Sequence, residues 1–431
     1  MVPEIEMAQV DEIKLLQEQK LSKLITYLAQ YSPFYQRLFK TENIDITDIK
    51  KIEDLVKIPT SNKDDLQQYN EDFFCVPKTE IIDYVTTSGT LGDPVTIGLT
   101  DADLERLAYN EAISYACAGV QKEDILQLTT TLDRRFMAGL AYFLGARKLG
   151  SGIIRVGAGI PELQWDTILK FKPTYLIVVP SFLLKLIDYA KTHDIDFKNS
   201  GIKAAICIGE SLRDQDFGLN VLGTKIKSEW DIDLFSTYAS TEMSTAFTEC
   251  TEQQGGHLHP ELLIAEILDD KGNEVPEGYP GELTITTLGI EAMPLLRFRT
   301  GDVVVAHRLP CKCGRNTLRL GPVLGRKKQM IKYKGTTLYP PAMDNLLNDF
   351  SEVTNHVIEI YHNEFGTDEI RIKITTSSAS EGLLRNIKDH FRSRLRVSPK
   401  IEITDLKEIQ RLQASKLGRK PIRVIDARKD N

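Results

Sequence analysis

Apolar residues at helical spacing open the chain. From Ile13 to Leu28 they recur every three or four positions, which predicts an amphipathic helix. Ser32-Pro33 interrupts the pattern, and the aromatic and aliphatic residues of 34–39 predict a second, short helix. Ser61 is expected to cap a third helix that begins just after it, because a serine hydroxyl can accept a hydrogen bond from the first helical turn.

From about residue 80, short apolar runs alternate with helical stretches. Strands are predicted at Ile81–Thr86, Ile125–Thr129, Gly152–Val156, Tyr175–Val179 and Ala204–Ile208. Helices are predicted at Asp101–Ala118, with Asp101 as N-cap, in a stretch through Leu144, and at Ser181–Lys191. This alternation predicts a layered sheet with helices on both faces.

The last third of the chain changes character twice. Residues 260–325 hold shorter strands between turns, which predicts a mostly β subdomain. Strands at Val357–Tyr361, Ile370–Thr375 and Ile401–Ile403, with a helix at Glu381–Leu395, then predict a small α+β unit. The expected fold class is therefore α/β, with domains at 1–327 (core 80–255, β subdomain 256–325) and 328–431.

Composition narrows the class of protein. The chain has 431 residues, an apolar fraction of 42% and a net charge of −7, without a strongly basic stretch, so a nucleic-acid partner is not expected. We identify no secretion signal and no apolar run of membrane-spanning length. The six cysteines are too sparse for a disulfide scaffold, so a cytoplasmic location is expected.

The loop at 86–94 is the first candidate for chemistry. It reads Thr-Thr-Ser-Gly-Thr-Leu-Gly-Asp-Pro and follows a predicted strand. Glycines let the backbone approach a ligand, and hydroxyl groups add donors, which suits a polyphosphate. The loop lacks the Gly-Lys-Ser/Thr ending of a Walker motif, and taken alone it is also typical of an ordinary turn.

Further segments give the loop a context. They are Phe235–Glu242, Leu296–Asp302, Gly325–Gly335 and Ser415–Val424. In this order and at these separations they resemble the adenylate-forming superfamily, which includes acyl-CoA synthetases and the adenylation domains of peptide synthetases. The nearer likeness, to phenylacetate–coenzyme A ligases, covers nearly the whole chain and includes the segments Ser32–Tyr35, Ile58–Thr60, Cys311–Arg315 and Lys420–Asp426.

The resemblance implies a function and a set of nucleotide-binding residues. The expected enzyme is an ATP-dependent acyl- or aryl-CoA ligase, which makes an acyl-AMP with pyrophosphate release and then transfers the acyl group to CoA. By the same resemblance, ATP is expected to contact Thr87, Ser88, Gly89, Thr90, Gly92, Gly209, Glu210, Tyr238, Ala239, Asp302 and Arg326. Within this set the loop would wrap the β- and γ-phosphates, Gly209-Glu210 and Tyr238 would contact adenine, and Asp302 would bind the ribose.

The resemblance also implies the catalytic groups. Glu242 would hold Mg²⁺, and Thr241 would touch the α-phosphate. Lys420 would stabilise the negative charge that develops during adenylation. Lys328 would be the hinge about which the C-terminal domain turns between the two half-reactions.

Two positions depart from the family pattern. The loop usually carries a lysine before its proline, where this chain has Asp93, and Leu91 stands where threonine is commoner. An acid near a triphosphate is unfavourable if it points inward, so Asp93 is expected to point outward. The hinge is usually an aspartate, and here it is Lys328.

A zinc site is the second candidate for chemistry. Cys250 and His257 precede the run of short strands predicted at 260–325, while Cys311 and Cys313 form a C-x-C within it. Three thiolates and one imidazole suit tetrahedral, structural Zn²⁺. His259 competes with His257 as the fourth ligand, and the alternative interpretation is unliganded buried cysteines with a surface histidine.

The acid substrate and the acceptor stay open. Phe136-Met137-Ala138-Gly139 indicate an apolar acid, whereas Arg134-Arg135 would fit a second polar group on the substrate. The thiol acceptor is CoA or a carrier protein. A nucleotide-binding protein that has lost catalysis is the remaining alternative, and Lys420, Glu242 and Asp302 argue against it. The partners are expected to be small molecules, and relatives that dimerise favour a homodimer.

Overall fold

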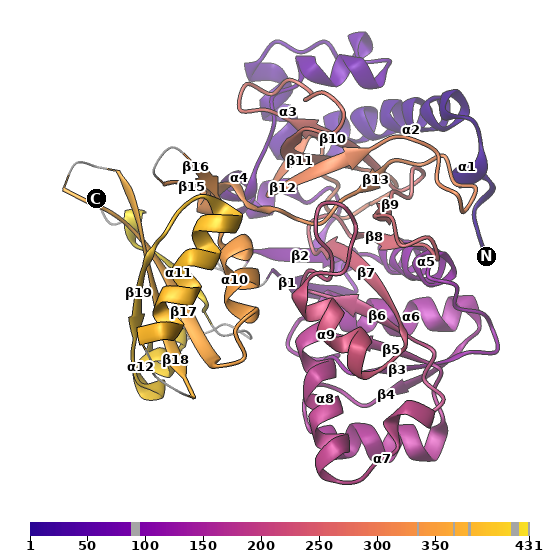
Figure 1. Cartoon of the computed structure of the whole chain (residues 1–431). Helices are drawn as coiled ribbons and strands as arrows, with labels where there is room; N and C mark the ends of the chain where they lie inside the picture. The colour runs from indigo at the N-terminus through magenta and orange to yellow at the C-terminus, as the bar shows by residue number, and fades with distance from the viewer. Residues whose placement is uncertain (88–94, 334–335, 365–366, 378–380, 415–421, 430–431) are drawn as a thin grey trace. The chain divides into compact units, whose positions relative to one another are not determined.

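The structure is a computed structural model that describes residues 1–87, 95–333, 336–364, 367–377, 381–414 and 422–429 (Figure 1). The predicted phosphate loop residues Ser88, Gly89, Thr90 and Gly92, together with Leu91, Asp93 and Lys420, lie outside the described residues. The chain divides into two compact units after Val323, which differs from the predicted boundary after residue 327. Each unit is described by itself.

One long sheet runs through the first unit. Its parallel part has the order β4 (Gly152–Arg155), β3 (Ile125–Leu128), β5 (Tyr175–Val178), β6 (Ala204–Ile208) and β7 (Asp233–Ser240). It continues with antiparallel neighbours β8 (Thr245–Glu249), β9 (Gly256–His257), β13 (Arg319–Leu320), β12 (Phe298–His307), β11 (Pro280–Thr287) and β10 (Leu263–Leu268). The strands predicted up to residue 208 match within two residues at each end.

Helices cover both faces of the parallel part, as the alternation predicts. They are α5 (Asp101–Cys117) and α6 (Met137–Leu149) on one face, and α7 (Pro161–Phe171), α8 (Pro180–Thr192) and α9 (Val221–Glu229) on the other (Figure 1). Strand β5 shows why. Its residue Val178 packs with Trp165 of α7, and its neighbour Ile177 packs with Tyr142 of α6. Successive side chains of a strand point to opposite faces, so an entirely apolar strand needs cover on both.

The N-terminal helices pack on the antiparallel part of the sheet. They are α1 (Glu4–Met7), α2 (Val10–Tyr31), α3 (Pro33–Thr41) and α4 (Lys63–Gln68), and a hairpin of β1 (Asp83–Thr86) and β2 (Thr96–Leu99) follows. Short 3₁₀ helices lie at η1 (Ile46–Asp48), η2 (Ile52–Lys57), η3 (Asn70–Phe73), η4 (Lys78–Glu80) and η5 (Phe197–Asn199).

Two predicted helix caps are wrong. Asn62, and not Ser61, caps α4, because its side-chain oxygen accepts from the first-turn N–H groups, while the backbone of Ser61 pairs with β12. Thr100, and not Asp101, caps α5: its hydroxyl accepts from Asp103 N, and the Asp103 carboxylate accepts from Thr100 N.

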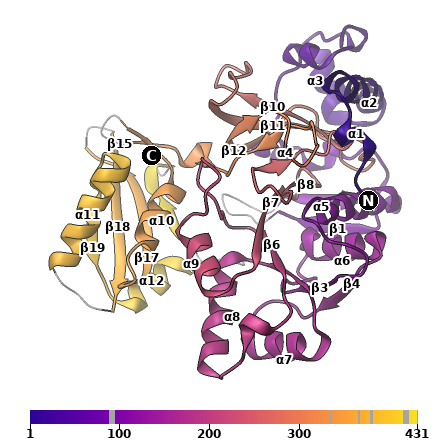
Figure 2. The ribbon, with the colours of Figure 1, turned by 45° about the vertical axis from the view of Figure 1, so that its right-hand side comes forward.

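The second unit is a small α+β fold (Figure 2). A sheet of order β19 (Lys400–Ile403), β18 (Asp368–Thr376), β17 (Val353–His362) and β20 (Val424–Asp426) is accompanied by α10 (Pro340–Asn348), α11 (Glu381–Leu395) and α12 (Leu406–Gln413). The unit also holds β14 (Gly325–Arg326), η6 (Lys327–Gln329), β15 (Ile331–Tyr333), β16 (Thr336–Leu338) and η7 (Ala427–Lys429).

The core of this unit is dominated by isoleucine. Ile358, Ile360 and Ile372 of the central strands pack against Ile387 and Phe391 of α11. The predicted mixed α/β class, with a large sheet domain and a smaller C-terminal domain, is confirmed. Among the described residues, the structure contains no helix long and apolar enough to cross a membrane.

Candidate functional site

The turn between β7 and β8 carries two of the predicted catalytic groups. Ser240 pairs with Thr245, so Thr241 and Glu242 lie in the four residues that connect the strands. The Ser240 hydroxyl accepts from Met243 N at 3.3 Å and helps to fix the turn. The largely buried carboxylate of Glu242 forms an ion pair with Lys63 at 3.3 Å.

Lys63, the partner of Glu242, was not among the residues predicted from the sequence. It is the first residue of α4. Two residues earlier, the backbone of Ser61 donates to Arg297 O, just before β12, and accepts from Arg299 N of β12. The ladder therefore attaches the start of α4 to β12 and holds Lys63 beside Glu242. Its sequence signal is its place shortly after Ile58-Pro59-Thr60, one of the segments that carry the family resemblance.

Tyr238 and Asp302 meet although their strands are not neighbours in the sheet. The Tyr238 hydroxyl donates to Asp302 Oδ2 at 2.7 Å. Burial first, and then the Asp302 charge, raise the pKa of Tyr238 well above its usual value, so the phenol stays protonated and remains a donor. Asp302 follows Gly301 within β12, and the φ of +81° at Gly301 fits the β-bulge at which the pairing of β11 and β12 shifts register. Ala239, next along β7, pairs with Ala246 of β8.

Gly209 and Glu210 lie at the carboxyl end of β6. Gly209 has a φ of +74°, which turns the chain out of the sheet. The Glu210 carboxylate accepts from both the backbone N–H and the hydroxyl of Ser181, each at 2.9 Å, at the start of α8. The side chain of Glu210 thus caps a helix.

Thr87 is the one predicted phosphate-loop residue that the structure describes. It is buried, its N–H donates to Val95 O at 3.0 Å, and its hydroxyl accepts from Val95 N at 3.0 Å. These bonds extend the β1–β2 hairpin by one pair of residues beyond Thr86, so Thr87 and Val95 lie side by side where the predicted loop begins and ends. The Thr86 N–H also donates to Arg135 O at 3.0 Å.

The predicted wall of the acid pocket contacts the β7–β8 turn through Met137. Buried Met137, at the start of α6, accepts a hydrogen bond from Ser244 Oγ at 3.8 Å through its sulfur. A Cβ at Gly139 would lie 2.0 Å from Thr131 O, so this position admits only glycine without a backbone shift. Arg134 and Arg135, which precede the wall, are exposed.

A buried arginine, Arg106, forms hydrogen bonds with the end of the β7–β8 turn. Arg106 of α5 donates to the carbonyl oxygens of Ser244, Leu262 and Leu288, and to the hydroxyl of Thr245. Burial lowers its pKa to about 10, which leaves it charged at neutral pH. The sequence signal is a cation inside a helix whose faces are mostly buried. Arg106 therefore ties α5 to the turn that carries Glu242.

Four potential metal ligands converge at the middle of the sheet. Cys250 follows β8, His257 ends β9, and Cys311 and Cys313 lie between β12 and β13. Their ligand atoms all lie within 4.8 Å of one another. Cys250 Sγ is 3.7 Å from Cys311 Sγ, and Cys313 Sγ is 3.5 Å from His257 Nε2.

The histidine environments separate the two candidates for the fourth ligand. His257 places Nε2 toward the sulfurs, and its Nδ1 contacts Thr317 Oγ1 at 2.9 Å. His259 is occupied at both ring nitrogens, by Glu6 at 2.6 Å and by Ser114 at 3.0 Å. His257 therefore belongs to the cluster and His259 to a neighbouring hydrogen-bond network.

His257 and Cys313 favour the protonation states that a metal needs, whereas burial raises the pKa of the Cys250 thiol. Burial lowers the pKa of His257 to about 3, so its imidazole is neutral at pH 7. Burial alone would raise the pKa of the Cys313 thiol, but hydrogen bonds from the backbone and side chain of Arg315 lower it below its ordinary value. A neutral imidazole and an accessible thiolate are the ligating forms.

The remaining predicted residues belong to the second unit. Arg326 lies in β14 and Lys328 in η6. The Lys328 carbonyl accepts from Arg428 Nη2 at 3.4 Å, and Met330 O accepts from Arg428 Nη1 at 2.8 Å. The segment that follows Lys328 is therefore held against the C-terminal residues of its own unit.

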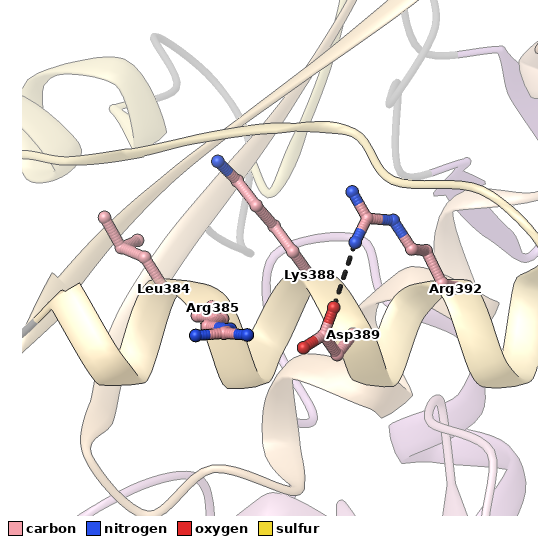
Figure 3. Close-up of a pocket in the computed structure, with 5 residues that line it drawn as sticks. All are labelled: Leu384, Arg385, Lys388, Asp389 and Arg392. Atoms are coloured by element: carbon pink, nitrogen blue, oxygen red, sulfur yellow. Dashed lines mark hydrogen bonds and ion pairs between the residues drawn. The ribbon is translucent and has the colours of Figure 1, made fainter.

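A groove on the exposed face of α11 is distinct from every predicted site residue (Figure 3). It encloses about 370 Å³ and is lined by Leu384, Arg385, Lys388, Asp389 and Arg392. Arg392 donates to the Asp389 carboxylate at 3.0 Å, so Asp389 balances part of the positive charge of the groove. A shallow groove on one helix does not provide the enclosed polar contacts that a nucleotide site needs.

Two family models match the chain. The model described as "AMP-binding enzyme" matches residues 20–291, and "AMP-binding enzyme C-terminal domain" matches residues 335–428. Among curated proteins, the phenylacetate-coenzyme A ligase of Thermus thermophilus is 32% identical over 87% of this chain and 84% of its own length. The Escherichia coli enzyme of the same name is 28% identical over 87% and 85%.

Solved structures give the same fold. A 2-hydroxyisobutyryl-CoA ligase in the postadenylation state, in complex with 2-HIB-AMP, has a TM-score of 0.85 and 24% identity, and covers 99% of this chain and 92% of its own. The same ligase with 2-HIB-AMP and CoA in the thioesterification state has a TM-score of 0.71 and 25% identity, with the same coverage.

Proposed function

The chain belongs to the AMP-binding enzyme family and is an AMP-forming acid–CoA ligase, and we propose that β7, β12 and the β7–β8 turn carry its first half-reaction. In that step a carboxylate oxygen of the acid attacks the α-phosphorus of ATP and pyrophosphate leaves, which gives the acyl-adenylate. In the second step the CoA sulfur attacks the acyl carbon, the thiol proton is lost, and AMP leaves.

The contact between Tyr238 and Asp302 is the observation that supports this assignment most. An aromatic ring suits the face of adenine, and a carboxylate suits the two ribose hydroxyls as acceptor. The 2.7 Å hydrogen bond fixes the two side chains relative to each other before a nucleotide arrives. Gly209, Glu210 and Ala239 would border the base, and Arg326 the ribose and phosphates.

Glu242, Thr241 and Lys63 are proposed to meet the phosphates. A carboxylate oxygen is the donor that Mg²⁺ prefers, so the chemistry of Glu242 fits this cation. When bound, Mg²⁺ would neutralise charge on the triphosphate. Lys63, 3.3 Å from Glu242, would add a cation near the outer phosphates. Thr87 would help to hold the loop that contacts them, in which Asp93 replaces the family's lysine.

Lys420 is proposed to stabilise the charge on the α-phosphate during adenylation, and Lys328 to act as the hinge of the second unit. These roles rest on the family resemblance. Turning of the C-terminal domain would withdraw Lys420 after the first step and admit the CoA thiol.

The acid is proposed to be apolar, with arylacetic acids as the first class to test. Met137 supports this because it contacts Ser244 of the β7–β8 turn, and Gly139 supports it because close packing against Thr131 leaves no room for a side chain there. The curated relatives at 32% and 28% identity are phenylacetate-coenzyme A ligases. Exposed Arg134 and Arg135 are proposed to stay outside the pocket.

Cys250, His257, Cys311 and Cys313 are proposed to hold a structural zinc ion. In a tetrahedral site two sulfurs should lie about 3.8 Å apart, and a sulfur and a nitrogen about 3.5 Å apart. The separation of 3.7 Å between Cys250 Sγ and Cys311 Sγ and that of 3.5 Å between Cys313 Sγ and His257 Nε2 fit these values. Elemental analysis should find about one equivalent of zinc, and less than about half an equivalent would count against the site.

Pyrophosphate release across a panel of carboxylic acids, with and without CoA, tests the activity. Phenylacetate and its analogues should give pyrophosphate, and CoA should give the thioester and AMP. Adenylate formation without any CoA-dependent thioester would indicate a carrier-protein acceptor. ATP binding without turnover of any acid would contradict the assignment.

A further inference from the structure

The N-terminal segment reaches the Cys/His cluster through one buried carboxylate. Glu6 of α1 is fully buried, and a buried carboxylate needs partners. Its Oε2 accepts from Arg315 Nε at 2.6 Å, and its Oε1 contacts His259 Nδ1 at 2.6 Å. Both partners are distant in sequence and lie around the cluster.

Arg315 extends this connection to a proposed zinc ligand. Its guanidinium is 4% exposed, and Nη1 donates to Cys313 Sγ at 3.6 Å. Nη2 has no hydrogen-bond partner in the described part of the chain. The position of this buried cation therefore depends on Glu6 on one side and on the sulfur on the other. Groups that orient a metal ligand in this way commonly affect how tightly the metal is held.

The backbone of the same segment packs on the cysteine turn. Asn316 N donates to Glu6 O at 2.9 Å, and Asn316 Nδ2 donates to Met7 O and Ala8 O at 3.2 and 3.0 Å. Gly314 has a φ of +92°, and a Cβ there would lie 3.4 Å from Met7 Sδ. Residues 6–8 thus contact the turn that presents Cys313.

We propose that Glu6 is a positioning residue for the Cys250–His257–Cys311–Cys313 site: it holds Arg315 against Cys313, so that metal binding and docking of the N-terminal segment stabilise each other. The inference rests on the zinc site proposed above and adds a segment that contributes no ligand. Because coupling between two binding events is reciprocal, loss of either should weaken the other.

Zinc release measures one direction of this coupling. Full-length protein is loaded with zinc and mixed with a chromophoric chelator, and the release rate is followed. Glu6→Gln keeps the size of the side chain but removes its charge, and should release zinc about tenfold faster or more. Glu4→Gln, on the exposed face of the same helix, is the matched control and should match the wild type. Arg315→Lys keeps the charge without the fork and should fall between the two.

Hydrogen exchange measures the other direction. In Cys313→Ser, which lacks one ligand, the amides of residues 4–8 should exchange faster than in the wild type, while the amides of α8 stay unchanged and report an intact fold. A purely structural ion pair would lower the stability of Glu6→Gln without changing the zinc release rate of the folded protein.

The two proposals fail in different ways. If the wild type retains less than half an equivalent of zinc, the site itself and the role of Glu6 are both overturned. If zinc is retained and Glu6→Gln releases it at the wild-type rate, or if residues 4–8 exchange equally in Cys313→Ser, only the role of Glu6 is overturned.

Discussion

Tyr238 and Asp302 come from strands that are separated by three others in the sheet order, and one hydrogen bond of 2.7 Å joins them. The bond constrains the carboxylate that is proposed to bind ribose. A side chain that is already ordered loses less entropy when its ligand binds.

Substitutions of Asp302 and Tyr238 should lower kcat/KM for ATP by unequal factors. Asp302→Ala removes hydrogen bonds to a charged acceptor, each worth about 1.5 to 3 kcal/mol, so kcat/KM for ATP should fall at least tenfold. Tyr238→Phe keeps the aromatic ring, so it should lower kcat/KM for ATP by less than about tenfold. Initial rates at varied ATP measure both, with exposed Tyr279→Phe as control. A larger loss in Tyr238→Phe than in Asp302→Ala would contradict the assigned roles.

Glu111 of α5 predicts how the stability of the protein depends on pH. Burial raises its pKa from 4.5 to about 8, so the folded protein holds it protonated at pH 6 although the unfolded chain would ionise it. Stability is therefore fully retained below about pH 4.5 and decreases as pH rises toward 8.

Glu111→Gln removes this dependence, because an amide does not ionise. The variant should gain stability relative to the wild type between pH 5 and pH 8, on the order of 3 kcal/mol. Urea unfolding at the two pH values measures the difference. If the variant and the wild type differ in free energy of unfolding by the same amount at pH 5 and at pH 8, Glu111 does not titrate in this range.

Single residues divide into those the sequence could reveal and those it could not. Glu242 and Asp302 lie in recognisable motifs. Lys63 and Glu6 do not, because their roles depend on strands and turns more than 100 positions away. The choice of His257 over His259 likewise needed the structure, since only the fold determines which ring nitrogens are occupied.

At the scale of elements, the wall formed by the start of α6 should tolerate no added volume. Gly139→Ala would place a methyl group 2.0 Å from a backbone oxygen, so it should destabilise the protein by about 1 to 3 kcal/mol and lower kcat/KM for the acid. Thermal unfolding and initial rates measure the two effects. At Gly218 an added Cβ would meet only the Asp216 side chain, so Gly218→Ala is the control. An unchanged melting temperature in Gly139→Ala would contradict the clash.

Elements with an uninterrupted pattern were predictable, and strands of two residues were not. Strand β6 and helix α11 match their predicted ranges because an apolar run or a helical period is uninterrupted there. Strands β9 and β13 have two residues each and leave no period to detect. The caps of α4 and α5 were displaced by one residue, because neighbouring polar residues offered equivalent side chains.

At the scale of the molecule, the two half-reactions should separate by substitution. Lys420→Ala should slow adenylation by about 100-fold or more, while thioester formation from synthetic acyl-adenylate is spared. Lys328→Pro should restrict the hinge, spare adenylation, and slow the thioester step. Single-turnover assays of each step measure this, and equal loss of both steps in Lys420→Ala would refute its role.

The order of motifs along the whole chain predicted the family, and the family predicted a large sheet domain followed by a smaller C-terminal domain. It did not predict how the halves of the large sheet are joined. The parallel part ends at β7, and the antiparallel part reaches it through β8, β9 and β13. The proposed zinc ligands lie along this junction.

That junction has a consequence for how the protein unfolds. Strands β9 and β13 share only two residue pairs, so few backbone hydrogen bonds carry the sheet across it. A metal bound by Cys250, His257, Cys311 and Cys313 would make the two halves melt as one cooperative unit. Calorimetry of the first unit's transition should show a single peak with metal, and splitting of that peak after chelation. The cluster would then determine whether the large domain behaves as one folding unit or as two.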